Sequence, residues 1–141
     1  MTAKEIQELL NRGRQSKIDF EIIADEQYAQ PTLSWLTGDF FKFYQDVSKM
    51  LGVGSYGHYW DCDDFASLYR VLAQVCHART GTRQEAGIAV GEIYYFSEKM
   101  ACWHAINFAV VSNEIIYLEP QTGQAISLSP VEKESIWMYR I

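Results

Sequence analysis

The 141-residue sequence has no hydrophobic run near the roughly 18 to 20 residues that a membrane-spanning helix requires. Its first residues are already charged and do not form a secretory signal, so we expect a cytoplasmic location. It has only three cysteines, an odd number without metal-ligand spacing, which argues against a disulfide scaffold. Basic residues are also few. Twelve Lys and Arg against eighteen Asp and Glu give a net charge of −6, which argues against nucleic acid as the main partner.

Bulky apolar side chains are abundant instead. Apolar residues make up 48% of the sequence and aromatic residues 14%. A chain of this length and composition can bury a core without a disulfide or a metal, and so many aromatic residues suggest an aromatic-lined groove. No repeat, low-complexity segment or linker divides the sequence, so residues 1–141 are expected to form a single domain.

Three segments have apolar residues at helical spacing: residues 3–12, residues 39–51 and the segment that follows Asp61. The third is the strongest, because an apolar stripe runs from Phe65 to Cys76. Asp61 is a good N-cap with Asp64 three residues later. A loop rich in glycine and aromatic residues comes before it. We therefore expect the helix to begin at Cys62.

The second half of the sequence changes to the alternation typical of strands, after a loop containing Gly81. The candidate strands are 86–96, 102–112, 114–119, 125–128 and 135–140, with one earlier candidate around 18–22. Helices first and strands second predict an α+β fold with an antiparallel sheet. The short connection at Ser112 and Asn113 predicts that 102–112 and 114–119 form a hairpin.

Cys62 is the first candidate for chemistry. Unpaired backbone N–H groups and the helix dipole at a helix start favour the thiolate, which is the nucleophilic form of cysteine. The alternative is a small buried hydrophobic residue, the usual role of a free cysteine. Cys76 and Cys102 lie within apolar patterns, and we interpret both as core residues.

His104 and Glu119 are the candidates to act with Cys62. Alternation places His104 on the strand face of Ile106 and Phe108, which is expected to face the core and the helix, where it could act as a base toward the thiol. Strand pairing would bring Glu119 back near His104, where a carboxylate can orient an imidazole. The alternatives are a hydrogen-bonded core histidine and a solvated strand-end carboxylate. Asn107 competes with Glu119 but points to the opposite face.

Acidic residues surround Cys62, although negative charge raises the pKa of a thiol. A bound cation would resolve this conflict, and carboxylate and amide oxygens suit a hard ion such as Ca²⁺. The candidate ligands are Asp63, Asp64, Glu119 and Gln121. The alternative is that one aspartate caps the helix and the others are solvated.

Three short segments resemble the papain-like cysteine peptidase group, and within it the calcium-dependent protease domain of a chimeric fungal lectin. These segments are Tyr59-Trp60-Asp61-Cys62-Asp63-Asp64-Phe65-Ala66, Trp103-His104-Ala105-Ile106-Asn107 and Leu118-Glu119-Pro120-Gln121-Thr122-Gly123. The resemblance implies a papain-like fold, with Cys62 as nucleophile, His104 as base and Glu119 as the third member of a triad. It also implies calcium near the triad, and so supports Asp63, Asp64 and Gln121 as metal ligands.

Three functions remain open on these grounds. The first is a cysteine-dependent hydrolase of peptides or proteins. The second is a non-catalytic module with the papain-like fold, such as a phage or bacterial accessory protein, whose groove binds a peptide or partner through Tyr59, Trp60 and Trp103. The third is an amide transferase of the transglutaminase-like branch, which shares the order of a helix cysteine and a strand histidine.

Overall fold

The computed structural model describes residues 1–80 and 86–141, so the loop predicted around Gly81 lies outside the described residues. Its helices are α1 (Ala3–Leu10), α2 (Leu33–Thr37), α3 (Asp39–Met50), α4 (Cys62–Ala78) and α5 (Pro130–Glu134). Its strands are β1 (Phe20–Ile22), β2 (Tyr28–Ala29), β3 (Gly87–Ile88), β4 (Val90–Ser97), β5 (Cys102–Val111), β6 (Glu114–Glu119), β7 (Gln124–Ile126) and β8 (Met138–Arg140). Among the described residues, no helix is long and apolar enough to cross a membrane.

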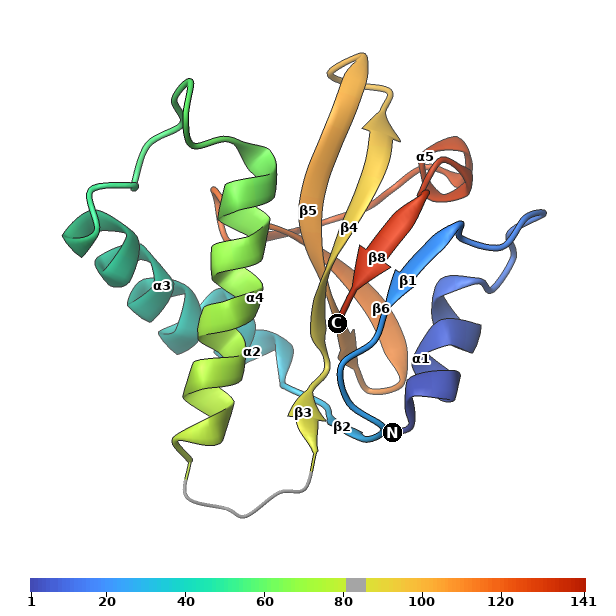
Figure 1. The fold of residues 1–141 in the computed structure, drawn as a ribbon, viewed down its shortest axis with the longest axis horizontal. Helices are drawn as coiled ribbons and strands as arrows, with labels where there is room; N and C mark the ends of the chain where they lie inside the picture. The colour runs from blue at the N-terminus through green and yellow to red at the C-terminus, as the bar shows by residue number, and fades with distance from the viewer. Residues whose placement is uncertain (81–85) are drawn as a thin grey trace.

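Six strands form one twisted sheet in the order β1-β8-β4-β5-β6-β7 (Figure 1). Neighbouring strands are antiparallel except β1 and β8, which are parallel. The predicted hairpin is confirmed as β5 and β6. Its turn holds Ser112 and Asn113 at φ values of 52° and 63°, a left-handed conformation that asparagine tolerates better than most residues. The predicted α+β class is thus confirmed, whereas the finer papain-like assignment is not.

Helix starts follow from capping residues. Thr2 accepts the backbone N–H of Glu5 at the start of α1, and α4 begins at Cys62 as predicted, with Asp61 as its N-cap. The sequence prediction missed two five-residue helices, α2 and α5. They begin after Thr32 and Ser129, whose side chains accept backbone N–H groups three residues later. Segments this short hold too few apolar residues to show a helical period.

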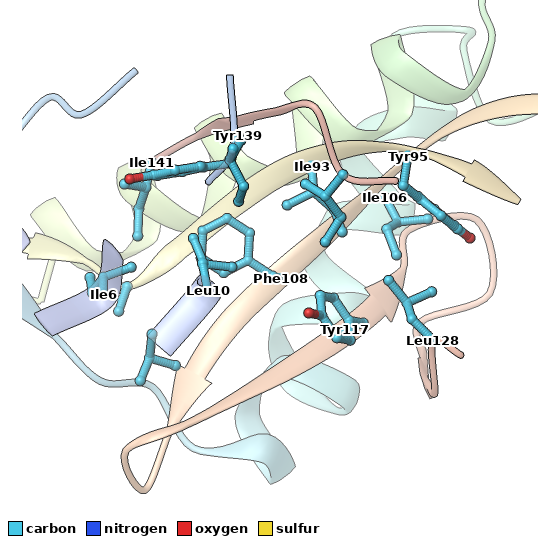
Figure 2. Close-up of a cluster of buried hydrophobic side chains, with 14 of the residues drawn as sticks. Ile6, Leu10, Ile93, Tyr95, Ile106, Phe108, Tyr117, Leu128, Tyr139 and Ile141 are labelled. Atoms are coloured by element: carbon cyan, nitrogen blue, oxygen red, sulfur yellow. The ribbon is translucent and has the colours of Figure 1, made fainter. Parts of the chain in front are cut away.

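Helices cover both faces of the sheet. On one face, α1 buries Ile6 and Leu10 against side chains of the central strands, including Phe108 (Figure 2). On the other face, α2, α3 and α4 bury a second cluster around Phe40 and Tyr69, whose rings meet edge to face at 4.8 Å. Each fully buried aromatic or branched side chain contributes about 1.5 to 3 kcal/mol, so both clusters stabilise the sheet.

The side-chain pattern of β5 corrects one prediction. Ile106, Phe108 and Val110 belong to the buried apolar cluster that α1 covers with Ile6 and Leu10, which we call the α1 cluster. They therefore do not face the cysteine-bearing helix α4. The α4 side is instead the face of Asn107, whose buried amide donates hydrogen bonds to the carbonyl oxygens of Ala66 (2.9 Å) and Gly91 (3.0 Å). Alternation fixes which residues share a face, but it does not say which helix covers that face.

Candidate functional site

The first turn of α4 places Cys62 at the end of the glycine-rich loop. The Asp64 carboxylate accepts the backbone N–H of Asp61 at 3.1 Å, which fixes the chain direction at the helix start. Cys62 is half-buried there, at the free N–H groups of the helix. Its position next to the helix dipole follows directly from the capping pattern.

His104 and Glu119 meet at the open end of the β5–β6 hairpin, near the start of α4. Tyr117 and Ile106 both belong to the α1 cluster, and Glu119 and His104 lie two residues further along the same faces of β6 and β5. The imidazole Nε2 lies 2.9 Å from the Glu119 carboxylate. His104 is only 8% exposed, so this hydrogen bond is shielded from water.

The same imidazole also interacts with the Cys62 thiol. Burial lowers the pKa of His104. The imidazole donates hydrogen bonds to Cys62 and to the Glu119 carboxylate, and these bonds, together with the electrostatic attraction of both groups, outweigh burial and raise the pKa from 6.5 to about 9. The structure therefore brings together a thiol, an imidazole and a carboxylate from α4, β5 and β6. Their functional roles stay predictions.

Two carboxylates lie beside the thiol. One ligand atom from each of Asp61, Cys62 and Asp63 lies within 4.8 Å of the others, and Oδ1 of Asp61 is buried without a hydrogen-bond partner among the described residues. A hydrogen bond with Asp61, burial and the Asp61 charge raise the pKa of Asp63 to about 6. The geometry and oxygen chemistry of Asp61 and Asp63 fit a cation.

Two other predicted metal ligands, Asp64 and Gln121, are not part of this cluster. Asp64 is occupied with the Asp61 backbone N–H, and Gln121 lines a separate small pocket between α3 and the Pro120 turn. The sequence pattern indicated Asp61 only as a helix cap. Its spacing one residue before Cys62 could have marked it as a ligand, because an N-cap carboxylate and the first helical residue necessarily lie close together.

The three aromatic candidates differ in exposure. Tyr59 is 92% exposed and its ring contacts His58. Trp60 instead packs edge to face on Phe65 at 6.0 Å, so it supports the start of α4 and offers little surface to a ligand. Trp103 is 59% exposed.

Trp103 belongs to a row of four exposed rings that crosses the sheet, which we call the aromatic row: Phe20, Trp137, Trp103 and Phe96. Consecutive ring centroids lie 5.7, 6.4 and 5.7 Å apart, each pair being nearly perpendicular. Register and alternation place Phe20, Phe96 and Trp103 on the sheet face that carries α4, in a part that stays exposed. Ring contacts with Phe20 and Trp103 place Trp137 on the same face. The sequence pattern indicated only Trp103, because the row joins residues from β1, β4 and β5 with the residue just before β8.

Tyr94 connects the aromatic row with the start of α4. The ring of Tyr94 contacts that of Trp137 at 6.0 Å. Burial raises the pKa of Tyr94 to about 12, and the charges of Asp63 and Cys62 also contribute to this rise. Tyr94 therefore lies between the aromatic row and the start of α4.

Two solved structures have this fold. One is a PSL1a–E64 complex, which matches with a TM-score of 0.75 at 16% sequence identity, over 100% of this chain and 51% of that one. The other is the Polyporus squamosus lectin bound to the human-type influenza-binding epitope Neu5Aca2-6Galb1-4GlcNAc. It matches with a TM-score of 0.74 at 15% identity, over 100% of this chain and 49% of that one. The chain thus spans about half the length of these neighbours, and the likeness at this identity is one of fold.

No family model and no curated protein matches the sequence. The structural neighbours overturn the resemblance drawn in the sequence analysis, because they are named for a lectin and one of them holds a glycan. The predicted cysteine peptidase, the enzymatic activity and the peptide or protein substrate are corrected accordingly, and the findings favour the binding-module alternative. The resemblance depended on a few residues around Cys62, His104 and Glu119, and so short a pattern determines neither a family nor a reaction.

Proposed function

We propose that this chain is a binding domain whose ligand is an oligosaccharide that lies along the aromatic row. The observation that carries the proposal is the row itself, four exposed rings in contact across the sheet. A sugar ring has an apolar C–H face and a rim of hydroxyl groups, so it packs well on an exposed aromatic side chain. Contiguous exposed apolar surface on a folded domain commonly marks a binding site.

Polar groups flank the row where a sugar needs them. Arg140 is exposed, and its register with Ile22 places it on the sheet face of Phe20. A guanidinium can donate paired hydrogen bonds to hydroxyl groups or to the carboxylate of an acidic sugar. Tyr94 leads from Trp137, inside the row, toward the start of α4, so a ligand of several sugar rings would also lie near Cys62. The glycan of the lectin neighbour, which contains an acidic sugar, is consistent with this chemistry.

Titration calorimetry with that sialylated trisaccharide and with its neutral counterpart lacking the acidic sugar tests the proposal. We expect Trp103→Ala and Trp137→Ala each to weaken binding about tenfold or more, since aromatic anchors dominate binding surfaces. Arg140→Gln should remove the preference for the sialylated form. Leu51→Ala is the control, because Leu51 is 56% exposed at the end of α3, away from the row. Absence of saturable binding, or equal binding by all variants, would refute the proposal.

We also propose that Asp61 and Asp63 hold Ca²⁺ at the start of α4. The buried, unpartnered oxygen of Asp61 and the closeness of the Asp63 carboxylate support this assignment. Calorimetry should show heat on adding calcium to the wild type, and that heat should disappear in Asp63→Asn. Asp39→Asn, an aspartate in the first turn of α3, is the matched control. A wild type that takes up no calcium at millimolar concentration would end the assignment.

A further inference from the structure

A second cavity lies behind the His104–Glu119 pair. Its volume is about 420 Å³, and both of these side chains line it. Tyr95 also lines it and belongs to the α1 cluster, so the cavity opens on the sheet face opposite the aromatic row. Figure 2 shows Tyr95 and Leu128, another lining residue, at the same end of that cluster. Cavities that bind small molecules commonly measure roughly 300 to 1,000 Å³, so this one is large enough for a ligand.

The walls of the cavity combine polar and apolar groups. Thr122, Gln124 and Ser127 provide two hydroxyl groups and an amide, while Ile126 and Leu128 provide an apolar surface. Within the described residues, the side chains of Gln124 and Ser127 make no hydrogen bond to the protein, so they are available to a ligand.

The two carboxylates of the cavity already have hydrogen-bond partners in the protein. The Glu132 carboxylate accepts the backbone N–H groups of Glu98 and Ser129, each at 3.0 Å. The Glu119 carboxylate is paired with the imidazole of His104. The exposed side chain of Lys99 also lines the cavity. A ligand with hydroxyl groups and C–H surface would match both the polar and the apolar walls.

We propose that this cavity binds a single sugar ring, on the far side of the His104–Glu119 pair from the aromatic row. Its hydroxyl groups would bond to Gln124, Ser127 and Thr122, and its C–H face would lie on Ile126 and Leu128. Because His104 forms part of the wall, the bound sugar changes the surroundings of the imidazole. This site does not depend on oligosaccharide binding by the aromatic row.

The imidazole resonances of His104, followed by NMR during titration with methyl β-galactoside and with N-acetylglucosamine, test the proposal. We expect a saturable shift of these resonances at millimolar sugar. Gln124→Ala should weaken binding about five- to tenfold, as expected for the loss of a hydrogen bond. Ser127→Trp, which fills the cavity with an indole, should abolish the titration.

Two controls separate this cavity from other surfaces. Gln15→Ala removes an exposed glutamine that lies outside the cavity, and Trp103→Ala removes an anchor of the aromatic row. Both variants should bind the single sugars like the wild type. The proposal is overturned if no resonance of His104 responds, or if both Gln124→Ala and Ser127→Trp titrate like the wild type. Loss of single-sugar binding in Trp103→Ala would also overturn it, because the ligand would then lie on the aromatic row.

Discussion

The hydrogen bond between His104 and Glu119 makes a quantitative prediction about pH. The pKa of His104 is raised from 6.5 to about 9, despite burial, by Cys62 and Glu119. A group whose pKa is higher in the folded state adds stability that is complete below its unfolded pKa and is lost as the pH rises through its folded pKa. The free energy of unfolding should therefore fall between pH 6.5 and 9, by about 3 kcal/mol if His104 acts alone.

Glu119→Gln isolates the carboxylate from this effect. The amide keeps the shape of the side chain but removes the negative charge 2.9 Å from the imidazole. A hydrogen bond to a charged partner is worth about 1.5 to 3 kcal/mol, so the pKa of His104 should fall by about 1 to 2 pH units. The decline of stability between pH 6.5 and 9 should become correspondingly shallower.

Urea unfolding at several pH values, combined with an NMR titration of the His104 ring, measures both quantities. Glu114→Gln is the matched control, because Glu114 is an exposed carboxylate at the opposite end of the same strand, β6. The reasoning would be refuted if His104 titrated below pH 7 in the wild type. It would equally be refuted if Glu119→Gln and Glu114→Gln had the same pH dependence.

Three further predictions concern packing and reactivity. Asn107→Ala should lower the free energy of unfolding, measured by urea titration, by about 2 to 4 kcal/mol. The reason is that the carbonyl oxygens of Ala66 and Gly91 would stay buried without their donor. A loss below about 0.5 kcal/mol would contradict this prediction. Gly123→Ala should lower the free energy of unfolding by about 2 kcal/mol or more, because Gly123 has φ of 70° and a Cβ atom there would lie 2.5 Å from the Phe41 ring. Gly52→Ala is the control for backbone strain alone, because Gly52 has a similar φ of 74° and a Cβ atom there would meet no atom within 4 Å. Iodoacetamide should label Cys62 faster than Cys76, as measured by mass spectrometry. The His104 imidazole lies beside Cys62, whereas burial raises the pKa of Cys76. Equal labelling rates would argue against an activated thiol at Cys62.

Local patterns in the sequence predicted most of the elements. Helix α4 and its first residue follow from Asp61 and from apolar spacing, both of which act within a few turns. The β5–β6 hairpin likewise follows from the short turn at Ser112 and Asn113. The parallel pair of β1 and β8 could not be predicted, because it joins residues more than a hundred positions apart and leaves no local signal.

The candidate site was predicted in part for the same reason. Glu119 lies close to His104 because hairpin register relates them, and register can be inferred from the turn. The contribution of Cys62 depends on how α4 lies against the sheet, which only packing of the two cores decides. Motif likeness then suggested a chemistry that the structural neighbours do not support.

The sequence by itself determined where helices and strands begin and which side chains share a face, because caps, turns and periodicity act between near neighbours. Only the tertiary structure decided that Phe20, Phe96, Trp103 and Trp137 form one exposed row. Only the tertiary structure showed that a cavity lies behind His104. Both features join distant segments across the sheet, and such contacts arise from the packing of whole elements against one another, which no local pattern encodes.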